Sequence, residues 1–215
     1  MAAVARKPVA RKPQASRQER REEIAQRLFE ATARLMGDGL TYTELSVDRL
    51  AGEAGISRAT FYLYFEDKGQ LLRMLAERVF AELAAASHRW YPVTEPKNLD
   101  HATASMAAVI ATYRRYQALI AAVIEMAAYD SEVARTHRRL IDEIAGTLRA
   151  TIEQRQTEGT IRALPAHEVA VALTWMVERT VHQTVRFTPP AEDGRLAEAL
   201  AHIVWNTLAP VPRTT

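Results

Sequence analysis

Apolar residues recur at three- and four-residue intervals along most of this 215-residue chain, and the alternation typical of strands is absent. Such spacing indicates amphipathic helices. A first helix is predicted from about Arg20 to Met36, where Gly37 and Gly39 suit a C-terminal cap. Its apolar face consists of Ile24, Leu28, Ala31 and Leu35.

Three further helices are predicted before residue 90, each preceded by a residue type that caps helix N-termini. Ser46 precedes the second helix, Ser57 precedes a short third helix that ends at Phe65, and Asp67 precedes a fourth that runs to about Ala86. Prolines in the stretch WYPVTEPKN then forbid a continuous helix. Helical patterns resume in five segments: about Leu99–Tyr116, Leu119–Tyr129, Ser131–Glu158, Ala166–Phe187 and Gly194–Leu208.

The turn between the second and third helices is short and contains Gly55, which is typical of a helix-turn-helix motif. The third helix crowds four aromatic residues into five positions. Phe61 and Phe65 lie four apart and are predicted to close a small core, whereas Thr60 and Tyr64 form a second pair on a different face. Tyr62 and Arg58 flank these faces, so the outward side of this helix is free to meet a partner.

A basic residue occupies the first turn of each of these helices: Arg49, Arg58 and Lys68. A cation there opposes the positive end of the helix dipole. Solvated surface charges are one explanation. Three such residues in succession favour another, in which the phosphates of a nucleic acid offset the repulsion, because helix N-termini bind phosphate well.

Charge and composition narrow the class of protein. The net charge is only +2, but five basic residues precede the first acid, Glu19, so positive charge is concentrated at the N-terminus. This proline-containing tail is predicted to be disordered and either increases solubility or reaches nucleic acid. Cysteine is absent, which excludes disulfides and thiolate sites and fits a reducing cytoplasm. No secretory signal or membrane span is predicted, because the most apolar stretch, residues 119–129, is too short.

The stretch LSVDRLAGEAGISRATFYLYFEDKGQLL resembles the N-terminal domain of the TetR family of bacterial transcriptional repressors. Residues 51–68 match the pattern A-x-x-A-G-[IV]-S-x-x-T-x-Y-x-[YH]-F-x-x-K. The resemblance implies that the third helix enters the major groove of double-stranded DNA, with phosphate contacts from Tyr62, Tyr64 and Lys68 and base contacts from Thr60 and Arg58. Together with the helix-start argument, the predicted DNA-binding residues are Ser46, Arg49, Ser57, Arg58, Thr60, Tyr62, Tyr64 and Lys68.

The C-terminal run LPAHEVAVALTWMVERT is similar to the subgroup of this family that contains the mycobacterial regulator of ethionamide activation. That relative has asparagines where this chain has Thr174 and Val177, so a shared ligand is not implied. Family members usually bind a small hydrophobic effector in this domain. The residues predicted to line such a pocket are Tyr113, Glu125, Met126, Tyr129, Thr174 and Trp175, with Met176 nearby. An ordinary core is the alternative, and Glu125 either anchors a ligand or pairs with Arg114 or Arg115.

The predicted fold is therefore all-α: an N-terminal three-helix helix-turn-helix module joined by a fourth helix to a larger C-terminal bundle. We assign residues 1–19 to the basic tail, 20–66 to the DNA-binding domain and 67–215 to a ligand-binding and dimerisation domain. The last two predicted helices are apolar over wide arcs, which predicts a homodimer through them.

The expected function is that of a ligand-responsive repressor on a near-palindromic operator. A sequence-nonspecific architectural DNA-binding protein is the alternative. An enzyme is not expected, since His167-Glu168 stands alone and no catalytic, cofactor or metal motif is present.

Overall fold

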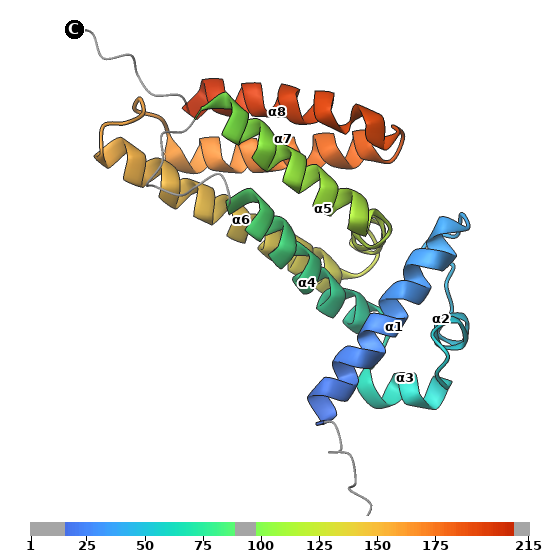
Figure 1. Cartoon of the computed structure of the whole chain (residues 1–215). Helices are drawn as coiled ribbons and strands as arrows, with labels where there is room; N and C mark the ends of the chain where they lie inside the picture. Colours follow the sequence, from blue (N-terminus) through green and yellow to red (C-terminus); the bar gives the residue numbers. More distant parts are fainter. Residues whose placement is uncertain (1–15, 89–97, 209–215) are drawn as a thin grey trace, which may run out of the picture.

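A computed structural model describes residues 16–88 and 98–208, and within these ranges every regular element is a helix (Figure 1). The predicted all-α fold is confirmed. The first fifteen residues of the predicted tail, and the predicted break around the prolines, lie outside the described residues. The elements are α1 (Arg17–Gly37), α2 (Val47–Glu53), α3 (Arg58–Tyr64), α4 (Lys68–His88), α5 (Leu99–Met126), α6 (Ser131–Thr157), α7 (Ala166–Val185), the short 3-10 helix η1 (Pro190–Glu192) and α8 (Asp193–Leu208).

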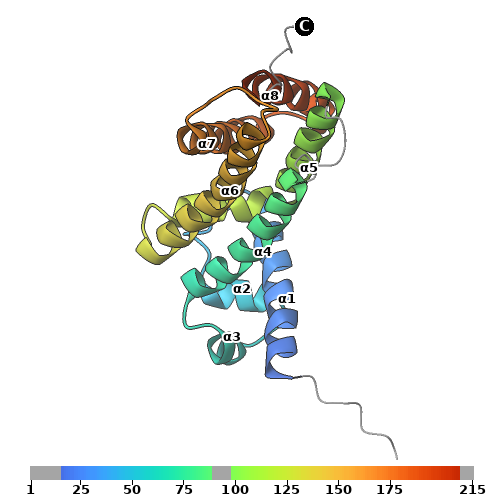
Figure 2. The same ribbon diagram turned by 90° about the vertical axis from the view of Figure 1, so that its left-hand side faces the viewer.

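Helices α1, α2 and α3 form a small module at one end of the molecule, and α4 leads from this module into the bundle of α5 to α8 (Figures 1 and 2). Helix α4 packs against both α5 and α6 and also touches α1. No helix in the described part of the chain is long and apolar enough to cross a membrane.

Helix α1 begins three residues before the predicted start at Arg20, because Ser16 caps it. The Ser16 hydroxyl accepts a hydrogen bond from the Glu19 backbone N–H at 3.2 Å, and the Glu19 carboxylate accepts one from the Ser16 N–H at 2.5 Å. This reciprocal capping box satisfies two backbone donors at the helix start. Arg17, which the sequence assigned to the tail, is therefore the first residue of α1.

Helix α5 is continuous from Leu99 to Met126, so the prediction of two helices in this segment is wrong. Gln117 and Ala118, which separate the two predicted segments, favour helix, and neither a glycine, a proline nor a cap interrupts the chain there. The break in the apolar pattern arises because α5 packs against several neighbours, including α4, α6, α7 and α8. Residues of the most apolar stretch, such as Leu119, Ile120 and Val123, are buried.

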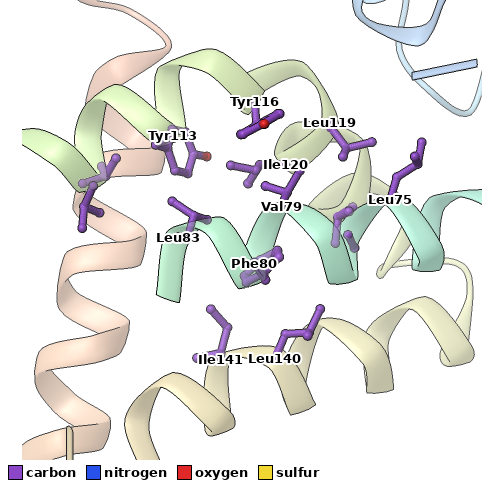
Figure 3. Close-up of a cluster of buried hydrophobic side chains, with 14 of the residues drawn as sticks. Leu75, Val79, Phe80, Leu83, Tyr113, Tyr116, Leu119, Ile120, Leu140 and Ile141 are labelled. Atoms are coloured by element: carbon purple, nitrogen blue, oxygen red, sulfur yellow. The ribbon is translucent and has the colours of Figure 1, made fainter. Parts of the chain in front are cut away.

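The centre of the bundle lies where α4, α5 and α6 meet (Figure 3). Each side chain here is at most 9% exposed, and fully burying an aliphatic or aromatic side chain contributes roughly 1.5–3 kcal/mol. Because α4 contributes to this core, it is held firmly between the module and the bundle. The residues are Leu75, Val79, Phe80 and Leu83 of α4, Tyr113, Tyr116, Leu119 and Ile120 of α5, and Leu140 and Ile141 of α6.

The small module has its own buried aromatic pair. Phe61 and Phe65 are 0% and 1% exposed, and their ring centroids lie 5.5 Å apart. The predicted core side of this short helix is therefore confirmed. Tyr62 is 46% exposed, whereas Thr60 and Tyr64, which were predicted to face outward, are half-buried.

Candidate DNA interface and ligand cavity

The turn between α2 and α3 is fixed by its backbone. Gly55 has φ +64°, a conformation that favours glycine, and the Ile56 N–H donates to the Ala51 carbonyl at 2.9 Å. The Arg27 guanidinium donates to the Gly55 carbonyl at 2.7 Å and so ties the turn to α1. The orientation of α3 is therefore fixed by the turn itself and by its contact with α1.

The three predicted N-caps are confirmed. The Ser46 hydroxyl accepts from the Arg49 N–H at 3.1 Å, and the Ser57 hydroxyl accepts from the Thr60 N–H at 3.0 Å. The Asp67 carboxylate accepts from the Gln70 N–H at 2.7 Å. These bonds fix the starts of α2, α3 and α4 with little dependence on the rest of the fold.

The outward side of α3 carries most of the predicted DNA-binding residues. Ser57, Arg58 and Tyr62 are exposed, whereas Thr60 and Tyr64 are half-buried. The Thr60 hydroxyl is hydrogen-bonded to the Ser57 hydroxyl at 2.8 Å. Helix α3 lies at the end of the molecule farthest from α7 and α8 (Figures 1 and 2).

A groove of about 470 Å³ runs between the start of α1 and the end of α3. Arg17 and Arg21 line it on one side, and Tyr62, Leu63 and Tyr64 line it on the other. The sequence analysis placed Arg17 only in the tail that could reach nucleic acid, and it missed Arg21, although the capping box at Ser16 would have placed them one helical turn apart. It also missed Leu63, which is 60% exposed on α3.

Two of the three helix-start cations remain on the surface. Arg58 pairs with Asp48 at 2.5 Å, and its guanidinium carbon lies 5.4 Å from the Tyr62 ring centroid. Both partners of this ion pair are about 60% exposed, so the pair contributes little to stability and can exchange for a phosphate contact. Arg49 is exposed, and we find no ion pair for it within the described ranges.

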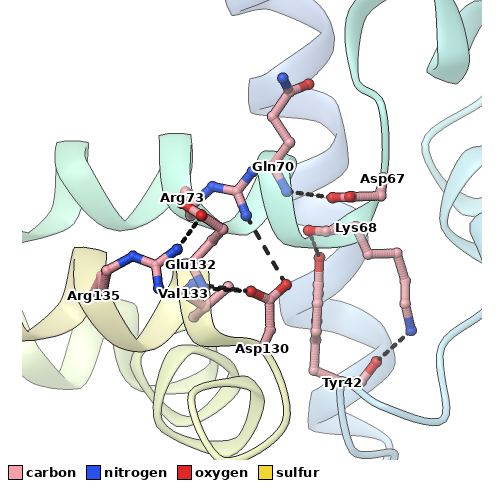
Figure 4. A network of polar contacts seen from close by, with 9 residues as sticks. All are labelled: Tyr42, Asp67, Lys68, Gln70, Arg73, Asp130, Glu132, Val133 and Arg135. Carbon is pink, nitrogen blue, oxygen red and sulfur yellow. Dashed lines mark hydrogen bonds and ion pairs between the residues drawn. The ribbon is translucent and has the colours of Figure 1, made fainter.

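Lys68 is placed differently from the prediction. Its ammonium donates to the Tyr42 carbonyl at 3.2 Å (Figure 4). It also donates to the carbonyls of Leu45 at 2.5 Å and of Thr43 at 3.2 Å. Burial lowers the pKa of Lys68, and the nearby Glu125 opposes this shift. The ammonium therefore ties the start of α4 to the loop before α2.

Glu125 does not belong to the pocket, and it pairs with neither of the two arginines that the sequence offered. Its carboxylate accepts hydrogen bonds from the Tyr42 N–H at 3.1 Å, the Thr43 N–H at 2.8 Å and the Thr43 hydroxyl. Arg114 instead pairs with Asp193 at 2.6 Å, and Arg115 pairs with Glu82 at 3.4 Å. Glu125 thus joins the end of α5 to the same loop that Lys68 holds.

The same junction includes the N-terminus of α6. Asp130 caps α6 by accepting from the N–H groups of Glu132 and Val133, and its second oxygen lies 4.0 Å from the Arg73 guanidinium (Figure 4). A side chain at Gly69 would meet this oxygen, since a Cβ there would lie 2.5 Å from it. Glycine at this position lets α4 approach α6 closely.

The bundle contains an apolar cavity of about 90 Å³. Of the six residues predicted to line a pocket, Tyr113 and Thr174 do so. Glu125, Met126, Tyr129 and Trp175 do not line it, because the cavity is lined by the part of α5 from Met106 to Ile120, and the Trp175 ring packs against His137 of α6. The lining is Phe80, Leu83, Ser87, Met106, Val109, Tyr113, Ile120, Ile141, Ile144, Leu148, Leu173, Thr174, Val177, Glu178, Val181 and Val204.

The misplaced residues have other surroundings. Tyr129 is 80% exposed in the turn after α5. The Trp175 ring packs edge-on against His137, with centroids 6.2 Å apart, and the Arg138 guanidinium carbon lies 5.7 Å from its centroid. Met176 also lies outside the cavity lining.

Two polar groups at the cavity were missed. Glu178 lines it directly, and His182 bonds through Nδ1 to the Tyr113 hydroxyl at 2.5 Å. Burial, and then Arg186, Arg179 and His137, lower the pKa of His182 to about 4, so its imidazole is neutral near pH 7. The signal was available, because Glu178 and His182 follow Thr174 at four-residue steps and so share its helix face.

A helix-turn-helix module whose helix α3 has an exposed outer side, joined to a helical bundle with a cavity, defines a DNA-binding transcriptional regulator. Residues 28–75 match the family model described as bacterial regulatory proteins, tetR family. Residues 102–208 match the model described as the C-terminal domain of transcriptional regulator EthR.

Similar proteins agree with both matches. The chain is 32% identical to the HTH-type transcriptional regulator EthR of Mycobacterium tuberculosis H37Rv over 182 residues, which cover 82% of this chain and 83% of that protein. It is 26% identical to EthR of Mycolicibacterium smegmatis over 183 residues, which cover 83% of each protein. The chain therefore belongs to the TetR family of bacterial transcriptional regulators, which are not enzymes.

Solved structures confirm the fold alone. The TetR-family regulator PfmR of Thermus thermophilus superposes with a TM-score of 0.66 at 21% identity, covering 85% of this chain and 98% of PfmR. Salmonella enterica GusR superposes with a TM-score of 0.65 at 18% identity, covering 86% of this chain and 95% of GusR.

Proposed function

We propose that this regulator is a repressor that binds a near-palindromic operator as a homodimer and leaves it when a small, mainly apolar effector enters the bundle cavity. The observation that carries this proposal is that two helices, α4 and α5, both line the cavity and bond to the loop before α2. Ile120 of α5 lines the cavity, and Glu125 of the same helix bonds to the loop. Phe80 of α4 lines the cavity, and Lys68 at the start of α4 bonds to the loop.

A shift of either helix would therefore act on the loop that leads into α2. Ser46, which caps α2, directly follows Leu45, whose carbonyl accepts from Lys68. Ligand binding alters the DNA-competent state only if the ligand binds the two arrangements with different affinities. The cavity is small, so an effector that widens it would favour an arrangement with a different separation of the two recognition helices.

Helices α7 and α8 supply the proposed dimer interface. Several of their large apolar side chains are only partly covered within one chain, and Ile203 is 47% exposed. A second copy placed on this surface would cover them and give a four-helix interface. The partly buried residues on these helices include Val169, Met176, Leu196 and Trp205.

The proposed DNA face is the outward side of α2 and α3. It comprises Ser46, Arg49, Ser57, Arg58, Thr60, Tyr62 and Tyr64, to which we add Arg17 and Arg21 of the neighbouring groove. Two copies of α3 would occupy successive major grooves about 34–36 Å apart. The protein would act in the cytoplasm, where bacterial DNA lies.

Selection of bound duplexes from a random library, followed by titration of the selected duplex, tests this function. We expect the selected duplex to be near-palindromic and to stay bound by the protein in a large excess of random duplex. Tyr62→Ala should weaken operator binding, because its exposed ring lies on the recognition helix. Tyr129→Ala is the matched control, since Tyr129 is also exposed but lies in the turn after α5. Equal affinity for random duplex would instead support an architectural DNA-binding protein.

A further inference from the structure

One acidic side chain at the cavity lacks the partners that such a group normally has. Glu178 lines the cavity, and its side chain is 10% exposed. Within residues 16–88 and 98–208, neither of its carboxylate oxygens has a hydrogen-bond partner. The Arg179 Nε lies 3.8 Å from one oxygen, beyond hydrogen-bond distance, and the Arg179 side chain is 50% exposed.

Two other polar groups at the cavity have partners within the protein itself. The Tyr113 hydroxyl is bonded to His182, and the Ser87 hydroxyl donates to the Ala84 carbonyl at 2.8 Å. Glu178 differs from these two groups, because no donor lies within hydrogen-bond distance of its carboxylate. Burial of a carboxylate without hydrogen-bond donors is unfavourable, and in this protein burial raises the pKa of Glu178, while Arg179 acts in the opposite direction.

We propose that the ligand of this cavity is a small apolar amine whose protonated nitrogen pairs with the Glu178 carboxylate. An ammonium offers both the charge and the several donors that the two free oxygens lack. The neutral His182 adds no competing positive charge at the cavity near pH 7. The remaining lining, including Phe80, Leu83 and Val109, would receive the hydrocarbon part.

The cavity of about 90 Å³ favours a slim hydrocarbon. An engineered cavity of about 150 Å³ holds benzene, so a linear chain fits this space better than a ring system. Hexylamine and hexan-1-ol share the same hydrocarbon chain and differ in the head group. Comparing the two isolates the contribution of the charge.

Isothermal titration of the full-length protein with each compound near pH 7.5 tests the proposal. We expect hexylamine to bind at least about tenfold more tightly than hexan-1-ol, because a hydrogen bond to a charged partner commonly contributes that much or more. Glu178→Gln should weaken hexylamine binding by roughly tenfold or more, and should change hexan-1-ol binding by less than about threefold. Glu178→Asp, which keeps the charge, should still prefer the amine.

Glu168→Gln is the matched control, because Glu168 is an exposed acid on the same helix. It should alter neither affinity. Thermal melts establish that each variant is folded. The proposal is overturned if the alcohol binds as tightly as the amine, if neither compound binds, or if Glu178→Gln leaves the preference for the amine intact.

The role of such an amine as effector rests on the proposed function. Its binding to the cavity does not. If the protein binds its operator but does not prefer the amine, the assignment of Glu178 is refuted and the proposed function as a regulator is not. Amine selectivity in a protein that holds no operator would support the assignment and refute the proposed function.

Discussion

Removal of the Glu125 carboxylate should loosen the loop that precedes α2 without unfolding the bundle. Three groups of this loop donate hydrogen bonds to that carboxylate: the N–H groups of Tyr42 and Thr43 and the Thr43 hydroxyl. Glu125→Ala leaves all three without their partner. The loop would then be held mainly by Lys68, whose charge would have lost its nearby acid.

The size of the effect follows from exposure. A hydrogen bond to a charged group contributes about 1.5–3 kcal/mol, but donors that reach water recover much of this. Thr43 is exposed, so its donors can bond to water, whereas Tyr42 is buried. The bond from the Tyr42 N–H should therefore account for most of the loss, and a total of about 2–3 kcal/mol is expected.

Hydrogen exchange at Leu45 is the sharpest measurement. Its N–H donates to the Tyr42 carbonyl at 3.2 Å and so reports the loop conformation without contacting Glu125. A loss of 2–3 kcal/mol should speed its exchange by roughly 30- to 160-fold, because about 1.4 kcal/mol is a factor of ten. Glu125→Gln, which keeps one acceptor oxygen, should give a smaller increase, and Glu168→Ala should give none. A folded Glu125→Ala protein with Leu45 exchange within threefold of wild type would refute the reasoning.

Three further outcomes are expected. Phe65→Ala should destabilise the small module by about 3–5 kcal/mol in circular-dichroism melts, whereas Tyr62→Ala should stay within about 0.5 kcal/mol. Lys68→Met should lower stability in urea titrations by about 1–3 kcal/mol, because the carbonyls of Thr43 and Leu45 lose the ammonium and that of Tyr42 keeps only the Leu45 N–H. An unchanged midpoint would mean that the ammonium is free for DNA. The pKa of His182 falls from 6.5 to about 4 on folding, so the free energy of unfolding should decrease as pH falls through this range. His182→Gln should reduce this decrease by an amount on the order of 3 kcal/mol.

Features set by residues close together in the sequence were predictable. Ser46, Ser57 and Asp67 cap helices because their side chains reach N–H groups two or three residues on, whatever the rest of the chain does. Phe61 and Phe65 share a buried face because they lie one helical turn apart. The missed start of α1 belongs to the same class, since the Ser16 capping box is visible in the sequence.

Features set by residues far apart were not predictable. Glu125 meets Thr43 across 82 positions, and Tyr113 meets His182 across 69. An acid near the end of an apolar helix fits a pocket anchor as well as a tie to another domain, and only the packing of α5 beside α1 decides between them. The error in α5 has a related cause, because a helix that changes neighbours along its length breaks the apolar pattern without any break in its backbone.

The contacts that the sequence could not predict are those that would carry regulation. Ile120 at the cavity and Glu125 at the loop are five residues apart, about 7.5 Å along α5. Phe80 and Lys68 are twelve residues apart, about 18 Å along α4. Because a hydrogen bond weakens markedly beyond about 3.2 Å, a small shift of either helix would break bonds to the loop. An effector therefore needs no contact with α2 or α3; it needs only to favour one placement of α4 and α5 over another.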